Sequence, residues 1–171
     1  MNEIVVRQLT PDDWERFRDI RLAALLDAPS AFGSTYAQTV IYTEHIWRSR
    51  LTTAAMFAAE ESGRLIGIAG GLPPQTNNTA ALISMWVDPA GRGHGIGEQL
   101  VNRVVQWARD EGFSSIKLWV TVGNDSAERL YARCGFVPTG EIEPIDNGSG
   151  HLEKSMELAL SGPGVPTPGY A

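Results

Sequence analysis

Residues 87–97 read VDPAGRGHGIG and join an apolar segment before them to an amphipathic segment after them. Four glycines alternate with larger residues from Gly91 to Gly97. Glycine allows positive φ and lets the backbone approach a ligand closely. Free amides at the start of a helix form a site for anions. The stretch therefore predicts a strand, then a phosphate or pyrophosphate cradle built mainly of backbone amides, then a helix.

The spacing of these glycines excludes two familiar nucleotide-binding loops. A dinucleotide fingerprint needs G-x-G-x-x-G. Its last position would be Ile96 when counted from Gly91, and Glu98 when counted from Gly93. A P-loop needs a lysine directly after its last glycine, and no lysine lies between residues 64 and 117. The cradle therefore fits neither type of nucleotide site.

The segments on either side of the loop predict a mixed α+β domain. Apolar, β-branched runs predict strands, and capped amphipathic runs predict helices. The expected strands are residues 4–9, 54–60, 64–70, 79–87, 115–122, 136–142 and 152–160. The expected helices are residues 10–28, a segment after residue 43, residues 97–111 and residues 125–134, with residues 30–39 irregular. Antiparallel strands come first and one strand–helix–strand crossover follows, so we expect an α+β fold with a mixed, mostly antiparallel central sheet flanked by helices.

Length and composition predict the organisation of the chain. Its 171 residues suit a single domain, which we place at residues 1–160. Residues 161–171 contain three prolines and three glycines, a composition that predicts a flexible C-terminal tail.

Charge, cysteine content and hydropathy exclude several classes of function. The net charge of −6, from 14 basic and 20 acidic residues, argues against a nucleic-acid partner. A single cysteine excludes an internal disulfide, and three scattered histidines predict no metal site. The sequence shows neither a signal peptide nor an apolar run of membrane length. We therefore expect a cytoplasmic protein with no membrane partner.

Two motifs resemble those of the GNAT N-acetyltransferase superfamily. Residues 87–97 resemble its acyl-CoA signature, Arg/Gln-x-x-Gly-x-Gly/Ala after a Val-x-Pro strand end, with Arg92, Gly95 and Gly97 at the fixed positions. Residues 124–136 resemble its second motif, N-x-x-A-x-x-L-Y-x-x-x-G-F. The matching residues there are Asn124, Ala127, Leu130, Tyr131, Gly135 and Phe136.

The resemblance implies a splayed pair of strands that binds acyl-CoA, with pantetheine lying between them. Acetyl-CoA, or another acyl-CoA, would then be the co-substrate, with no metal. Strand backbone groups would pair with the pantetheine amides, loop amides would hold the pyrophosphate, and an asparagine would contact the pantetheine arm. In chain order these residues are Met85, Trp86, Val87, Arg92, Gly93, His94, Gly95, Ile96, Gly97 and Asn124.

Tyr131 is the catalytic residue that the second motif implies. When an amine attacks the thioester, coenzyme A leaves as a thiolate, and a tyrosine hydroxyl near the sulfur can act as general acid. The general base stays open, because Ala81 and Trp119 occupy positions where some family members carry a glutamate. Five side chains are candidates for this base: His45, Glu141, Glu143, His151 and Glu153.

The resemblance implies transfer of an acetyl group from acetyl-CoA to a primary amine of a small molecule, by direct attack in a ternary complex. Phe32, Tyr36 and Trp119 are expected to line the acceptor site, and acidic residues at 141–146 would attract a cationic amine. Two alternatives stay open: acetylation of a protein N-terminus or lysine, and a non-catalytic acyl-CoA-binding sensor. Dimers are common in families of this kind, so a homodimer is one expected assembly.

Overall fold

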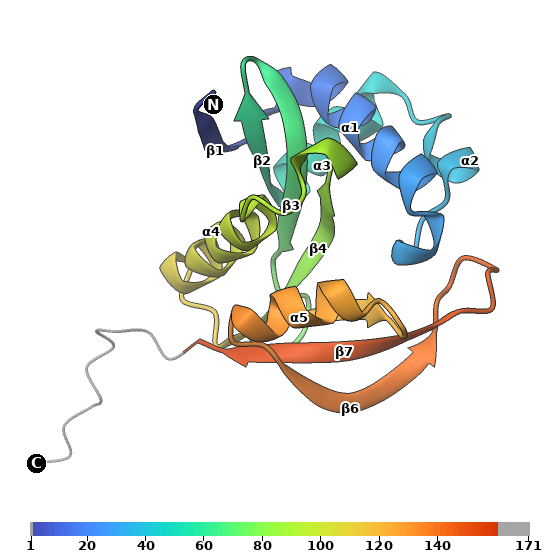
Figure 1. The fold of residues 1–171 in the computed structure, drawn as a ribbon, viewed down its shortest axis with the longest axis vertical. Helices are drawn as coiled ribbons and strands as arrows, with labels where there is room; N and C mark the ends of the chain where they lie inside the picture. The colour runs from blue at the N-terminus through green and yellow to red at the C-terminus, as the bar shows by residue number, and fades with distance from the viewer. Residues whose placement is uncertain (1, 161–171) are drawn as a thin grey trace, which may run out of the picture.

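The computed structural model describes residues 2–160, which form one seven-stranded sheet in the order β1-β2-β3-β4-β5-β7-β6 (Figure 1). All neighbouring strands are antiparallel except β4 and β5, which are parallel. The strands are β1 (Ile4–Gln8), β2 (Ala55–Glu61), β3 (Arg64–Leu72), β4 (Thr79–Val87), β5 (Ser115–Thr121), β6 (Val137–Pro144) and β7 (Leu152–Ala159). This arrangement confirms the predicted α+β fold. The tail predicted at residues 161–171 lies outside the described residues.

The parallel pair β4–β5 is the place where the sheet opens. Residues 79–81 of β4 lie opposite residues 115–117 of β5, although the two strands continue to Val87 and Thr121. On its other side β4 pairs with β3 as far as Val87, and β5 pairs with β7 along its whole length. Each strand therefore follows its outer neighbour, and the two diverge into the splay that the fold class predicts.

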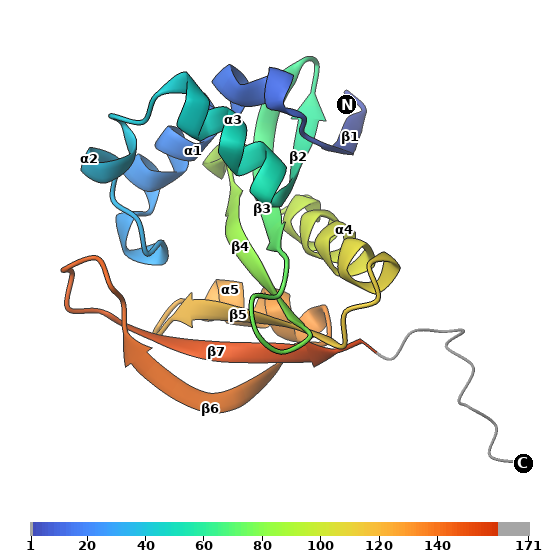
Figure 2. The same ribbon diagram turned by 180° about the vertical axis from the view of Figure 1, so that it is seen from behind.

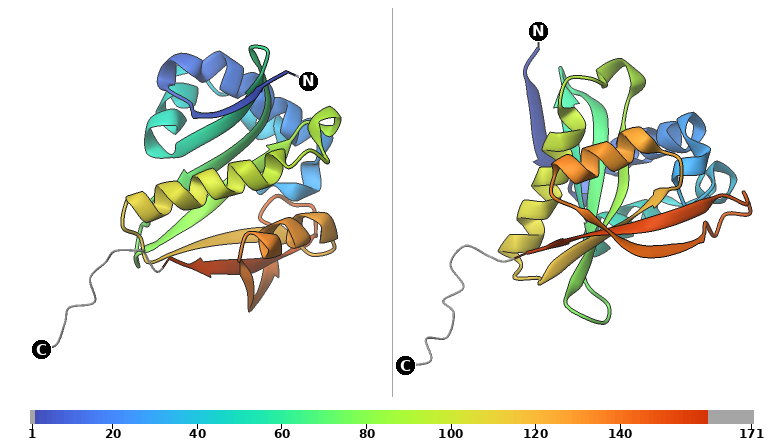
Figure 3. Two further views of the ribbon diagram at one scale, coloured as in Figure 1. Left: turned by 60° about the vertical axis from the view of Figure 1, so that its left-hand side comes forward. Right: turned by 60° about the horizontal axis from the view of Figure 1, so that its bottom comes forward.

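Helices cover both faces of the sheet. On one face lie α1 (Trp14–Asp27) and α3 (Glu44–Thr53), and on the other lie α4 (Ile96–Asp110) and α5 (Asp125–Arg133) (Figures 2 and 3). The segment expected to be irregular contains a 3-10 turn, Pro29–Ala31, and the single-turn helix α2, Tyr36–Thr39. None of the helices within residues 2–160 is long and apolar enough to cross a bilayer.

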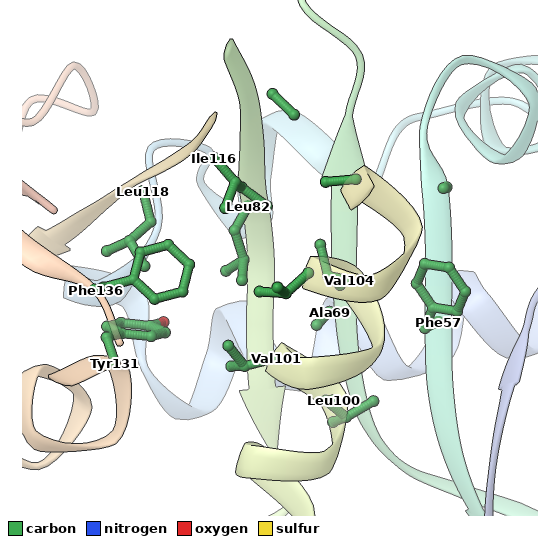
Figure 4. Close-up of a cluster of buried hydrophobic side chains, with 14 of the residues drawn as sticks. Phe57, Ala69, Leu82, Leu100, Val101, Val104, Ile116, Leu118, Tyr131 and Phe136 are labelled. Atoms are coloured by element: carbon green, nitrogen blue, oxygen red, sulfur yellow. The ribbon is translucent and has the colours of Figure 1, made fainter. Parts of the chain in front are cut away.

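The larger of two cores lies under α4. Leu100, Val101 and Val104 recur at helical spacing on one face of α4 and are fully buried (Figure 4). Strand β2 serves both cores, because successive side chains of a strand point to opposite faces. Phe57 belongs to the α4 core, whereas its neighbour Met56 belongs to the core under α1 and α3.

Two glycines of β3 allow α4 to approach the sheet closely. A Cβ atom at Gly67 would lie 2.9 Å from Cδ1 of Leu100, and one at Gly71 would overlap the ring of Trp107. That ring is also held by Phe113 in an edge-to-face contact with 5.4 Å between centroids. The sequence predicted a strand at these residues but did not indicate that its glycines make room for a helix. The helix that packs against them lies about 30 residues later in the chain.

The start of α5 is capped one residue before the helix. The sequence at Asp125 and Glu128 has the spacing of a capping box, but the structure does not form one there. Asn124 is the N-cap, and its Oδ1 accepts a hydrogen bond from the backbone N of Ala127 at 3.3 Å. The carboxylate of Glu128 forms an ion pair with Lys154 of β7 instead.

Gly71→Ala is expected to lower the free energy of unfolding by about 1–3 kcal/mol, the usual cost of overpacking, because the added methyl overlaps the Trp107 ring. Urea unfolding followed by fluorescence measures this difference. Gly33→Ala is the matched control, since a Cβ atom there meets no atom within 4 Å. Equal unfolding midpoints for the two variants would contradict the close approach of α4.

Candidate functional site

A cleft of about 710 Å³ opens where β4 and β5 diverge. Its walls are the ends of these strands, the glycine loop and one side of α5. Arg133 and Ser126 of α5 also line it, and the sequence analysis missed both. His94, predicted to bind the cofactor, is exposed and does not line the cleft. The other residues predicted to bind the cofactor do line it: Met85, Trp86, Val87, Arg92, Gly93, Gly95, Ile96, Gly97 and Asn124.

The glycine loop presents open backbone at one end of the cleft. Gly93 and Gly95 have φ values of 82° and 77°, the left-handed conformation that favours glycine. A Cβ atom at either position would meet no atom within 4 Å. Helix α4 begins directly after the loop, at Ile96, and the first amides of a helix have no intrahelical acceptor. The loop and the helix start therefore suit a phosphate group.

A β-bulge shapes the β4 wall of the cleft. The register with β3 shifts between Ile68 and Gly70, so that Ser84 and Met85 together face one residue of β3. Ser84 has a φ of 56°, which a non-glycine residue rarely adopts. Because a bulged residue is left unpaired in the ladder, the backbone near Met85 is free to pair with a ligand. The sequence carries no glycine at this position to signal the bulge.

Asp27, the last residue of α1, forms hydrogen bonds to both β4 and the glycine loop at the cleft. Its Oδ2 accepts a hydrogen bond from Nε1 of Trp86 at 3.0 Å and pairs with Nη2 of Arg92 at 2.7 Å. Arg92 Nε also donates to the carbonyl of Val87 at 3.0 Å. The bonds from Trp86 and Arg92 hold the pKa of Asp27 below its ordinary value, so its carboxylate is charged at neutral pH.

This network changes what the Arg92 side chain does. Its charge is shared with Asp27, so the guanidinium braces the loop against β4 and α1. Sequence analysis missed Asp27 because 65 residues separate it from Arg92, and only the fold brings them together.

Tyr131 lies on the buried face of α5 and is 7% exposed. Its ring packs edge-to-face against Phe136, with 6.1 Å between centroids, and Figure 4 shows it directed from α5 toward β4. Burial raises the pKa of the Tyr131 phenol well above its ordinary value, and the nearby Cys134 adds to this shift. The hydroxyl is therefore protonated at neutral pH and can donate a proton.

A second cavity, of about 430 Å³, lies beside α1 and α3 and meets the cleft at Tyr131. Both spaces are lined by Tyr131, Met85, Phe32 and Trp119. These shared residues include two of the three that were expected to line the acceptor site, Phe32 and Trp119. The third, Tyr36, lines neither space, and its side chain is partly exposed on α2.

Glu153 of β7 is the one candidate for the general base that lines the second cavity. Burial, and then the nearby Glu143, raise the pKa of Glu153 above its ordinary value. Glu141 is exposed and forms an ion pair with Lys117 at 2.8 Å. The remaining candidates, His45, Glu143 and His151, are exposed and line neither space. Within residues 2–160, no three His, Cys, Asp or Glu side chains gather as a metal site would require.

Comparison with known proteins identifies relatives of this chain. Residues 14–136 match the Acetyltransferase (GNAT) family. N-acetyltransferase 8 of Rattus norvegicus is 34% identical over 92 residues, which are 52% of this chain and 41% of that protein. The chain spans about half the length of the curated relatives that it matches.

Solved structures share the fold. A Salmonella typhimurium structure determined with its cofactor acetyl-CoA has a TM-score of 0.75 at 21% identity, covering 97% of this chain and 99% of that one. Spermidine N-acetyltransferase from Vibrio cholerae, in complex with CoA and spermine, has a TM-score of 0.72 at 21% identity. That match covers 92% of this chain and 96% of the other. At this level of identity the likeness establishes the fold.

Proposed function

Because the chain belongs to the acetyltransferase (GNAT) family, we propose that it transfers an acetyl group from acetyl-CoA to a primary amine of a small molecule. The observation that carries the proposal is the position of Tyr131, a buried and protonated phenol where two cavities meet. One cavity has the glycine loop at its end and suits coenzyme A. The other suits the amine, so both reactants would reach the same hydroxyl.

The cofactor would lie along the splay. The backbone of Met85, Trp86 and Val87 would pair with the pantetheine amides, since the β4 edge facing β5 is unpaired beyond Ala81. Loop and helix amides at residues 92–97 would hold the pyrophosphate. Asn124 uses its Oδ1 to cap α5, which leaves its Nδ2 free to donate to the pantetheine arm.

Tyr131 would act as general acid toward the departing thiolate. A general acid must carry its proton at the working pH and lie within hydrogen-bond reach of the group it protonates. Tyr131 meets the first condition, because its phenol is protonated at neutral pH. The shared lining of the two cavities supports the second, because it places the phenol where the thioester and the amine would meet.

Glu153 would act as general base for the attacking ammonium group, directly or through water. A general base works best when its pKa lies near the operating pH, and burial moves the pKa of Glu153 in that direction. Direct attack is favoured over an acyl-enzyme. The single cysteine of the chain, Cys134, lines neither cavity, and burial raises its thiol pKa away from the reactive thiolate.

Release of the coenzyme A thiol, measured across small amines, amino acids, peptides and aminoglycosides, tests the proposal. We expect release with small amines or amino acids. Release with peptides alone would instead favour acetylation of a protein N-terminus or lysine. Stabilisation by acetyl-CoA without release on any acceptor would favour a sensor.

Gly95→Val is expected to weaken acetyl-CoA binding by about tenfold or more, because the side chain strains a left-handed residue and fills the open anion site. Isothermal titration calorimetry measures the affinity.

In the parent protein, acetyl-CoA at about 100 times its Kd should raise the free energy of unfolding by about 2.7 kcal/mol.

Gly63→Val provides the matched control for Gly95→Val. Gly63 has a similar φ of 80° and equally open surroundings, but it lies in the β2–β3 hairpin away from the cleft. The control variant should bear the same strain and keep its affinity for acetyl-CoA. Unchanged affinity in a folded Gly95→Val variant would place the phosphate site elsewhere.

Tyr131→Phe is expected to lower kcat by about 100-fold or more, the usual contribution of a general acid. The Kd for acetyl-CoA should change little, because phenylalanine fills the same buried space. Steady-state thiol release gives kcat, and calorimetry gives Kd. An unaltered kcat would remove Tyr131 from the mechanism.

Glu153→Gln is expected to abolish the acidic limb of the pH profile of kcat/KM and to lower the rate about 100-fold. The base must be deprotonated, so activity in the parent protein falls as pH drops through the raised pKa of Glu153. Glu143 faces this side chain across β6–β7, and the same cavity is lined by Arg21, Arg50 and Lys117.

Glu157→Gln on the same strand as Glu153 is the control, since Glu157 does not line the cavity. Identical profiles for both variants would contradict the assignment.

A further inference from the structure

We propose that the acceptor carries a carboxylate in addition to its amine, and that Arg21 binds this carboxylate. The substrate class would then be small aminocarboxylates, amino acids foremost among them. This inference rests on the proposed function, since it concerns the cavity assigned above to the acceptor. It names a chemical group of the acceptor that amine acetylation alone does not require.

Arg21 is a buried cation that lacks an ion-pair partner within the described residues 2–160. It lies on α1, is 6% exposed, and lines the second cavity. Its Nη1 is fully buried and finds no hydrogen-bond partner within residues 2–160. Leaving a buried charged donor unpaired is costly, so a ligand is the natural source of the missing acceptor.

The surroundings of Arg21 orient it without neutralising it. Its Cζ lies over the ring of Phe32, 4.6 Å from the ring centroid, in a cation–π contact that supplies no hydrogen-bond acceptor in the plane of the guanidinium. Burial, and then repulsion by Arg50, lower the pKa of Arg21 to about 10. At neutral pH the group is still positively charged, and its strongest charged neighbour is a second cation.

The other charged groups around the cavity have roles already. Arg50 donates from Nη2 to the Tyr42 hydroxyl at 3.0 Å, and Lys117 forms its ion pair with Glu141. Glu153 is the only acidic side chain that lines the cavity within the described residues, and it is the proposed base. One unpartnered guanidinium calls for one monovalent anion. A carboxylate matches its planar pair of donors.

The rest of the cavity suits the body of such a molecule. Apart from these charges its lining combines apolar side chains, such as Ile83 of β4 and Trp119 of β5, with the hydroxyl groups of Ser34, Thr79 and Ser84. Its volume of about 430 Å³ falls within the range of small-molecule sites. The acidic residues at 141–146, which were expected to attract a cationic amine, do not line it. The charged side chains that line this cavity are therefore mostly basic, although the chain as a whole has a net charge of −6.

The first test compares substrates on the unaltered protein. Each apolar amino acid is assayed for thiol release beside its own carboxamide and its own decarboxylated amine. We expect kcat/KM to be about 10- to 100-fold higher for the acid, the range that a charged hydrogen bond supplies. Equal values for the three, or a preference for the compounds without a carboxylate, would overturn the inference and leave amine acetylation intact.

The second test uses Arg21→Met, which keeps an unbranched side chain but removes the guanidinium group and its charge. We expect KM for the amino acid to rise about 10- to 100-fold, while KM for the decarboxylated amine and for acetyl-CoA stays constant. Arg21→Lys should bring KM for the amino acid part of the way back toward the value of the parent protein. Arg18→Met is the matched control, because Arg18 lies on the same helix but pairs with the exposed Asp19.

Calorimetric binding of the amino acid to the protein saturated with coenzyme A separates the two proposals. Binding that is lost in Arg21→Met, in a protein that transfers no acetyl group, would support the carboxylate site and overturn the proposed reaction. If the protein transfers acetyl groups to amines but Arg21→Met binds the amino acid as tightly as the parent protein does, the carboxylate site alone would be overturned. Absence of both binding and transfer would overturn both.

Discussion

The divergence of β4 and β5 after three paired residues is the constraint on which the rest of the site depends. Each strand stays paired with its outer neighbour, so the sheet opens without losing the ladders that hold it. The opening lets Tyr131 of α5 reach a cavity on each side. The bulge at Ser84 adds unpaired backbone to the β4 wall. In the proposed reaction the two reactants would meet at this side chain, which is otherwise part of the core.

Packing and charge then fix the parts around this opening. Gly67 and Gly71 bring α4 close to β3, and each buried aliphatic side chain of α4 contributes about 1.5–3 kcal/mol. The start of α4, where we propose the phosphate site, is thereby held in place. Asp27 ties the loop to the far face of the sheet through Arg92 and Trp86. The chain is acidic overall, yet within residues 2–160 Nη1 of Arg21 is buried without a hydrogen-bond partner, in the cavity that we propose for the acceptor.

The sequence predicted the elements that depend on local signals. Periodicity and glycine or proline punctuation located the strands, α4 and the loop, and the two motifs pointed to the family and to Tyr131. Contacts between distant segments left no such signal. Asp27 meets Arg92 only after folding, Gly71 is needed because of Trp107, and the Ser84 bulge lacks a glycine. Glu153 was one of five candidates for the base until register and burial placed it beside the acceptor cavity.

A crystal structure of the protein with coenzyme A tests the central claim most directly. The account predicts pantetheine between β4 and β5, the pyrophosphate on the amides of residues 92–97, and the sulfur within hydrogen-bond reach of the Tyr131 hydroxyl. Coenzyme A bound outside the splay, or a sulfur directed away from Tyr131, would contradict it.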